Sequence, residues 1–189
     1  MGNAAQPFFF RSGSAELFAW LHPAAGAQPA PRLGLLICKP FGYEALCAHL
    51  SLRAWAQAAA QAGIPALRVD YAGTGDSADG DGQAEQLSAW SRDITDAAGQ
   101  LRRRCGVERV CLLGMRLGAL AASLAAAEHG GIDALIAIAP VVSGRRYLRE
   151  LRALQGSLMS AVQEQAQERP AVLEVTGFRL SAATVARLE

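Results

Sequence analysis

The sequence predicts an α/β fold in which helices cover both faces of a mainly parallel sheet. Strand-like runs alternate with helix-like runs through most of the chain, and several strand-like runs are apolar on both faces. An antiparallel hairpin comes first. The chain has 189 residues, enough for one domain with a sizeable core, and its 51% hydrophobic and 19% charged residues exclude a disordered chain.

The elements follow from turn signals and from the spacing of apolar residues. The hairpin joins strand-like residues 8–11 and 16–21 through a Ser-Gly-Ser turn. Later apolar runs predict buried strands at 33–40, 64–71, 107–114 and 133–142. Helices are predicted over 45–62, where Gly63 ends the helix, over 84–104, where apolar residues recur at helical spacing, and over 117–128.

The pattern changes after about residue 143. Residues 144–169 are charged and helix-prone with no strand before them, residues 172–175 have strand character, and the end of the chain is helix-like. We therefore expect a core over residues 1–142 and a partial, largely helical cap or lid over residues 143–189.

Composition and charge exclude several functions. The net charge is +1 and no basic stripe with interleaved aromatic residues occurs, which argues against nucleic-acid binding. No apolar run reaches the roughly 20 residues of a membrane span, and no secretory leader is recognisable. The cysteines form no C-x-x-C pair, so we expect a cytoplasmic protein with reduced thiols at positions 38, 47, 105 and 111, and no metal or cofactor.

The stretch VCLLGMRLGALAA, residues 110–122, predicts a strand, a tight turn and a helix. Gly114 and Gly118 flank the turn, and the backbone of the central residue, Arg116, is held in a strained conformation. Such a turn lifts the central side chain above the carboxyl edge of the sheet, where open α/β sheets bind ligands. The alternative is that the two glycines only pack the strand against the helix.

Three motifs resemble those of the α/β-hydrolases, especially the serine aminopeptidase-like, acyl-hydrolase and exosortase-associated branches. RVDYAGTGDS (68–77) resembles the loop after the fourth strand, LICKPFGYE (36–44) the oxyanion-hole loop, and LLGMRLGA (112–119) the nucleophile elbow. They stand in the family's order within residues 8–142. The resemblance implies the N-terminal part of an α/β-hydrolase core, with residues 143–189 where the family inserts a cap.

The resemblance also implies roles for matching residues. Arg116 stands at the nucleophile position, and the N–H groups of Leu117 and Phe41 are the expected oxyanion donors, since Pro40 has none. Tyr43 and Glu44 are expected at the rim of the same crevice. The structural loop is expected to comprise Asp70, which caps backbone N–H groups, and Gly73, Gly75 and Ser77.

The sequence departs from the family pattern in its reactive groups. The guanidinium of Arg116 stays protonated and cannot attack a carbonyl. The family's acid and histidine follow the cap, and none of His22, His49 and His129 is where its general base sits. Cys38 and Cys111 are alternative nucleophiles, although buried hydrophobic thiols are the simpler interpretation.

A cation at a helix N-terminus needs a compensating carboxylate or a bound anion. Glu44 is the candidate carboxylate, either paired with Arg116 or capping a helix, and we favour a structural role for it. Two backbone donors and a guanidinium would otherwise form a pocket for a carboxylate or phosphate.

Three functions remain open. The first is hydrolysis of an ester, thioester or amide with serine replaced by Arg116; the second is non-catalytic binding of an acyl or anionic small molecule. A nucleotide-binding domain is the weakest, because the sequence has no Walker lysine and no G-x-G-x-x-G. If sheet strands of the usual fold are missing, the exposed edge would favour a homodimer.

Overall fold

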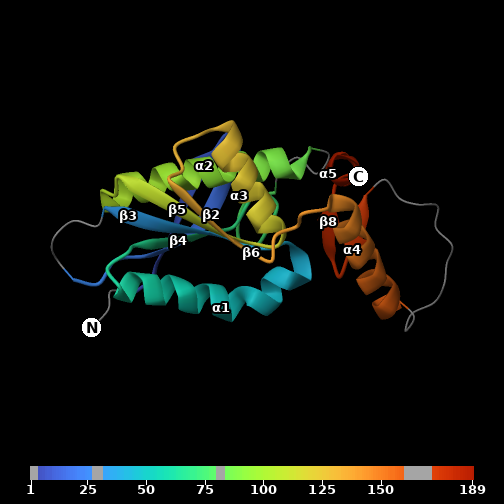
Figure 1. The fold of residues 1–189 in the computed structure, drawn as a ribbon, viewed down its shortest axis with the longest axis horizontal. Coiled ribbons are helices and arrows are strands. Elements are labelled where there is room, and N and C mark those ends of the chain that lie inside the picture. Colours follow the sequence, from blue (N-terminus) through green and yellow to red (C-terminus); the bar gives the residue numbers. More distant parts are fainter. Residues whose placement is uncertain (1–3, 27–31, 80–83, 160–171) are drawn as a thin grey trace.

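Six strands form one sheet in the order β1-β2-β4-β3-β5-β6 (Figure 1). The computed structural model describes residues 4–26, 32–79, 84–159 and 172–189. The strands of this sheet are β1 (Gln6–Ser12), β2 (Ala15–His22), β3 (Leu33–Cys38), β4 (Ala66–Val69), β5 (Arg109–Met115) and β6 (Ala134–Ile138).

The first two strands are antiparallel and the rest of the sheet is parallel. β1 and β2 form the predicted hairpin, and β2 also runs antiparallel to β4, with Trp20 opposite Arg68. β4, β3, β5 and β6 are mutually parallel neighbours, so their carboxyl ends lie at one edge. The predicted α/β class and the N-terminal hairpin are therefore confirmed.

Helices cover both faces of the sheet, as expected. α1 (Gly42–Gln61) lies on one face, and α2 (Gln86–Cys105) and α3 (Leu117–Glu128) lie on the other (Figure 1). α2 packs closely because β3 carries Gly34, where a Cβ would lie within 3.0 Å of the Leu101 side chain. α1 begins three residues before its predicted start and ends at Gln61, two residues before Gly63, whose φ is +82°. No described helix is long and apolar enough to cross a membrane.

The prediction that residues 133–142 form a buried strand is wrong. β6 lies at the edge of the sheet, and Leu135 and Ile136 are 37% and 50% exposed. Apolar residues on both faces predicted a covered strand, but the sheet order decides whether neighbouring elements cover it. Among the described residues, nothing pairs with the outer side of β6.

The C-terminal segment combines helices with a short pair of strands, and the first of these strands falls where the sequence has strand character. It comprises α4 (Gly144–Met159), a two-stranded antiparallel sheet of β7 (Leu173–Val175) and β8 (Phe178–Leu180), and α5 (Ala182–Leu188). β7 lies within residues 172–175, where strand character was expected, whereas β8, of the same length, was not foreseen. Residues 160–169 of the predicted long helix lie outside the described residues.

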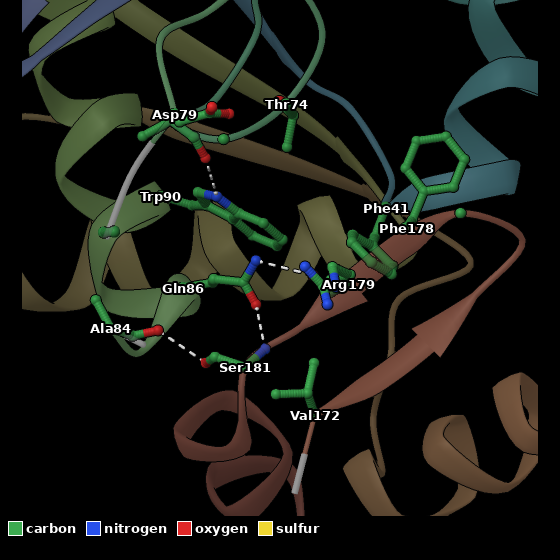
Figure 2. Close-up of a pocket in the computed structure, with 14 residues that line it drawn as sticks. Phe41, Thr74, Asp79, Ala84, Gln86, Trp90, Val172, Phe178, Arg179 and Ser181 are labelled. Carbon is green, nitrogen blue, oxygen red and sulfur yellow. Dashed lines mark hydrogen bonds between the residues drawn. The ribbon is translucent and has the colours of Figure 1, made fainter. Parts of the chain in front are cut away.

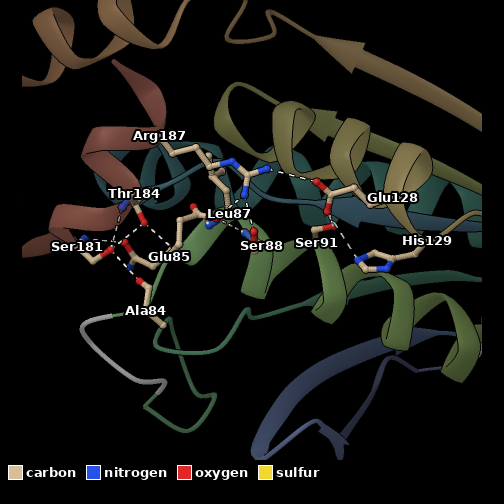
Figure 3. A network of polar contacts seen from close by, with 11 residues as sticks. Ala84, Glu85, Leu87, Ser88, Ser91, Glu128, His129, Ser181, Thr184 and Arg187 are labelled. Carbon is tan, nitrogen blue, oxygen red and sulfur yellow. Dashed lines mark hydrogen bonds and ion pairs between the residues drawn. The ribbon is translucent and has the colours of Figure 1, made fainter.

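A polar network attaches α5 to the core (Figure 3). Arg187 pairs with Glu85, which caps the N-terminus of α2, and with Glu128 at the end of α3, 3.3 Å away. Ser181 caps α5 by accepting the Thr184 N–H, and the Thr184 hydroxyl accepts the Gln86 N–H at 2.8 Å. The C-terminal segment is therefore fixed to α2 beside the carboxyl edge of the sheet.

A buried carboxylate, Asp93, links the hairpin to α2. Its oxygens accept hydrogen bonds from the Ser12 hydroxyl at 2.7 Å and from the Ala72 N–H at 2.9 Å. Burial raises the pKa of Asp93, although both hydrogen bonds oppose the shift.

The Asp93→Asn variant should reveal this raised pKa in the pH dependence of stability. A folded-state pKa above the unfolded value, about 4, makes the free energy of unfolding fall as the pH rises through the folded pKa. Urea denaturation at several pH values should therefore show the difference between wild type and Asp93→Asn shrinking from pH 4 to pH 7. A difference that grows over this range would contradict the shift.

Candidate functional site

A strained bend joins β5 to α3 at the carboxyl edge of the sheet. Its crest is Arg116, with φ 52° and ψ −121°, a backbone conformation that costs a non-glycine residue about 1–3 kcal/mol. The backbone N–H of Arg116 donates to the carbonyl of Ile138 at 3.0 Å, and its own carbonyl accepts the Val141 N–H at 3.4 Å. These bonds to β6 and the segment after it hold the bend in place.

Both glycines of the bend are required by close backbone approaches. A Cβ at Gly114 would lie 2.5 Å from the Cα of Ala119, within α3 itself. A Cβ at Gly118 would lie well inside 3.0 Å of the carbonyl oxygens of Cys38 and Lys39, at the end of β3. The bend therefore packs directly against the 38–42 segment, as the motifs led us to expect, and the glycines do more than pack β5 on its own helix.

The side chain of Arg116 is neutralised by two carboxylates from different parts of the chain. Its Nε donates to Glu44 on α1 at 2.8 Å, and a terminal nitrogen donates to Glu150 on α4 at 2.6 Å. The guanidinium also lies 5.4 Å from the ring centroid of Tyr147, whose hydroxyl donates to the second oxygen of Glu44 at 3.4 Å. Glu44 thus takes the pairing role that the sequence left open, since the N-cap of α1 is Phe41.

Electrostatics favour the charged forms of Arg116 and Glu150. The hydrogen bond to Glu150, followed by that to Glu44, raises the pKa of Arg116 above its already high value. The hydrogen bond from Arg116 holds the pKa of Glu150 below its usual range. The cluster is therefore a charged clamp between the core and α4, which we call the Arg116 clamp, comprising Arg116, Glu44, Glu150 and Tyr147.

Two helix N-termini begin beside the Arg116 clamp. Phe41 precedes α1 in an extended conformation, and Leu117 is the first residue of α3; both side chains are buried. Within the described residues, neither the Phe41 N–H nor the Leu117 N–H donates a hydrogen bond. Unpaired N–H groups at helix starts can bind a carbonyl oxygen or an anion.

The loop after β4 is built around Asp70. One carboxylate oxygen of Asp70 accepts the Asp76 N–H at 3.0 Å, and the other pairs with Lys39 at 2.5 Å. Gly75, with φ +60°, lies so close that a Cβ would overlap the Asp70 carboxylate. Gly73 has φ +73°, and the Ser77 hydroxyl donates to the carbonyl of Asp70 at 2.5 Å while accepting the Phe18 N–H at 2.9 Å.

The two alternative thiols are buried hydrophobic groups. Cys38 and Cys111 are both buried, and burial raises the pKa of both thiols. Neither is placed to attack as a thiolate.

The histidines stand apart from the bend. His22 is buried on β2, where its Nε2 accepts from Arg68 at 3.2 Å; burial, followed by the charges of Arg68 and Arg53, lowers its pKa to about 4. His49 and His129 are exposed on α1 and at the end of α3. Among the described residues, no histidine contacts Arg116 or Cys38, and no group of three or more potential metal ligands occurs.

A cavity of about 550 Å³ lies beside this edge, between the loop after β4, the start of α2 and the β7–β8 hairpin (Figure 2). Of the predicted site residues, Phe41 and Gly73 line it; Arg116, Leu117 and Glu44 do not. Tyr43 is 51% exposed on α1 beside Cys47 and does not line it either. The lining residues are Phe41, Ala72, Gly73, Thr74, Asp79, Ala84, Gln86, Ala89, Trp90, Val172, Gly177, Phe178, Arg179 and Ser181.

Sequence reasoning missed three side chains of this region. Glu150 and Tyr147 lie on α4, and helical periodicity does not say which core residue a cap helix contacts. Lys39 stands in the quoted motif, but only its pairing with Asp70 across two loops shows a role. A lysine and an aspartate that each end a neighbouring parallel strand were the available signal, since such ends share one edge.

Comparisons with known proteins agree with this geometry. The family model described as Serine aminopeptidase, S33 matches residues 49–179. No curated protein sequence matches the chain.

Among solved structures, Est1E from Butyrivibrio proteoclasticus with ferulic acid bound superposes with TM-score 0.67 and 21% identity, over 96% of this chain and 70% of that one. The α/β hydrolase GrgF from Penicillium sp. sh18 gives 0.65 and 20%, over 98% and 73%. The proline iminopeptidase-related protein from Thermus thermophilus gives 0.58 and 20%, over 82% of this chain and 51% of that chain. At these identities the likeness concerns the fold.

Gly118→Ala should destabilise the protein strongly because the new methyl group meets backbone atoms that cannot move aside. We expect a loss of about 2–3 kcal/mol in the free energy of unfolding, measured by urea denaturation. Gly156→Ala on α4 is the matched control, since no atom lies within 4 Å of its Cβ position, and it should be neutral or slightly stabilising. Equal stabilities of the two variants would refute the close approach.

Arg116→Met should loosen α4 because it removes both ion pairs of the Arg116 clamp. Hydrogen–deuterium exchange should show faster exchange of amides in residues 144–156 than in wild type. The control is Arg152→Met on the same helix, α4. It removes an exposed ion pair with Glu189 and should change little. Unchanged exchange in Arg116→Met would mean that the clamp does not hold α4.

Proposed function

Because the chain belongs to the serine aminopeptidase S33 family and has the α/β-hydrolase fold, we propose that it hydrolyses an ester, thioester or amide bond of an acyl compound, with Arg116 at the position of the family's nucleophilic serine. The observation that carries this proposal is the strained bend at Arg116, packed against the 38–42 segment. In the hydrolases, this arrangement brings the reactive residue and the oxyanion donors together.

The chemistry follows from the groups at the crest. Arginine cannot attack a carbonyl, so the attacking group is water and Arg116 acts as a fixed positive charge. The water loses a proton to solvent as its oxygen bonds to the carbonyl carbon, and the leaving alcohol, thiol or amine takes up a proton from solvent when the tetrahedral adduct collapses. As the carbonyl becomes tetrahedral, negative charge develops on its oxygen. The N–H groups of Phe41 and Leu117 supply partial positive charge at this edge, and the guanidinium adds to it once the substrate displaces Glu150. Such electrostatic stabilisation lowers the barrier of acyl transfer.

The pairing of Arg116 supports a second candidate function, binding without catalysis. Two of the three guanidinium nitrogens of Arg116 are paired with carboxylates, and no described side chain at the crest is a nucleophile with an adjacent base. This favours a non-catalytic relative that binds an acyl or anionic small molecule, whose carboxylate would replace Glu150 on Arg116. Glu150 is the more exposed of the two acidic partners and therefore the easier one to displace.

Ester hydrolysis by Arg116 variants separates the two candidates. If the protein is an enzyme, wild type should hydrolyse 4-nitrophenyl acyl esters, and Arg116→Ala should lose about 100-fold or more in kcat/KM, the effect of removing one charge-stabilising group. Arg32→Ala is the matched control, because Arg32 forms an exposed ion pair with Glu108 at the opposite edge of the sheet.

The same assay can also contradict the enzymatic proposal. No turnover by wild type, or turnover that arises only in Arg116→Ser, would contradict the enzymatic proposal and support the binding protein. In that case isothermal titration of wild type with butyrate should show binding that Arg116→Ala abolishes.

A further inference from the structure

The 550 Å³ cavity has the size of a small-molecule site, typically about 300–1,000 Å³, yet it lies outside the Arg116 clamp. Phe41 connects the two, because its backbone belongs to the 38–42 segment and its ring lines the cavity. The ring centroid of Phe41 lies 6.0 Å from that of Trp90 and 6.1 Å from that of Phe178. A compound held at the Phe41 N–H could therefore extend into the cavity.

Aromatic rings dominate one side of the cavity. Phe41, Trp90 and Phe178 come from three separate elements, and Figure 2 shows Phe41 and Phe178 next to each other beyond the Trp90 ring. The Trp90 indole is also backed by Tyr71 at a centroid distance of 5.3 Å, which holds it in place. Rigid ring faces and edges favour a flat, apolar ligand group.

Some polar side chains that line the cavity already have hydrogen-bond or ion-pair partners, and others remain available to a ligand. The Gln86 side chain accepts the Ser181 N–H at 2.9 Å and donates to the carbonyl of Arg179 at 3.1 Å, so it joins the hairpin to α2. Arg179 itself pairs with Glu174 at 3.2 Å. On the other side of Trp90 lie Thr74 and Asp79 (Figure 2), and Asp79 has no partner within the described residues.

These contacts set the charge of the lining. Among the described residues that line the cavity, Arg179 is balanced by Glu174, so the remaining uncompensated charge is the exposed Asp79 carboxylate. The Thr74 hydroxyl donates to the carbonyl of Tyr71 at 2.8 Å and so has only acceptor capacity left. A ligand group at this end of the cavity must donate a hydrogen bond, and an anion there would be repelled.

We propose that the cavity binds a flat, aromatic part of the ligand and that this part carries a hydroxyl donor rather than a carboxylate. This proposal adds a ligand class to the proposed function. It rests on that function only in treating the aromatic group as part of the substrate. The hydroxyl lies at Asp79 and Thr74, the ring lies among Phe41, Trp90 and Phe178, and the reacting carbonyl lies toward Phe41.

Three matched probes test the proposal by isothermal titration of the full chain: 4-propylphenol, 4-propylanisole and 4-propylbenzoate. The phenol should bind about three- to tenfold more tightly than the anisole, the range expected for one hydrogen bond, and the benzoate should bind most weakly. Asp79→Asn should reduce the preference for the phenol over the benzoate. Asp76→Asn, in the same loop but not lining the cavity, should leave it unchanged.

A second pair of variants tests the place of binding. Phe178→Ala should weaken all three probes about tenfold, whereas Phe9→Ala, on exposed β1, should weaken none. Thermal denaturation checks that both variants fold.

The proposal is overturned if no probe binds, if the benzoate binds most tightly, or if Phe178→Ala has no effect. Because these measurements need no turnover, binding without ester hydrolysis would refute only the proposed enzymatic activity. Hydrolysis without probe binding would refute only the assignment of the cavity.

Discussion

The backbone of α3 rests directly on the end of β3, and the candidate site depends on this contact. At Gly118 there is no room for a side chain between the helix and the carbonyl oxygens of Cys38 and Lys39. This close contact fixes the position of the bend relative to the 38–42 segment. It thereby brings the first residues of α1 and α3 to the same edge of the sheet. The positive φ of Arg116 is the strain that this geometry imposes on a residue other than glycine.

Arginine at the crest changes what the bend does. A small neutral side chain there would be free to face a ligand, whereas the guanidinium spans the gap between α1 and α4 and contacts Glu44 and Glu150. The same residue therefore links the core to the C-terminal segment, which is otherwise held by the Arg187 network and the β7–β8 hairpin. Binding at the crest and the position of α4 are thus physically connected, since a ligand anion would compete with Glu150.

The sequence predicted the features that short-range physics determines. Some backbone conformations and close contacts are possible only for glycine, and the glycines at 114 and 118 and in the loop after β4 indicate where these occur. The bend and this loop could therefore be predicted from the sequence. What it could not predict depends on tertiary position. The apolar run of β6 suits a covered strand but lies at an edge, and Glu150 reaches Arg116 only through the orientation of α4. The cavity likewise needs Phe178 and Trp90 to line the same space, although 88 positions separate them.

The Arg116 clamp also has a consequence for solution conditions. Its cation cannot lose its proton near neutrality, and the pKa of Glu150 is held low, so mild changes of acidity leave the pair charged. Glu44 and Glu150 are nonetheless partly open to water, where dissolved ions weaken charge attraction. The ionic part of the attachment of α4 is therefore governed by ionic strength more than by pH, whereas the burial of Leu148 and Leu151 against the core does not depend on dissolved salt in this way.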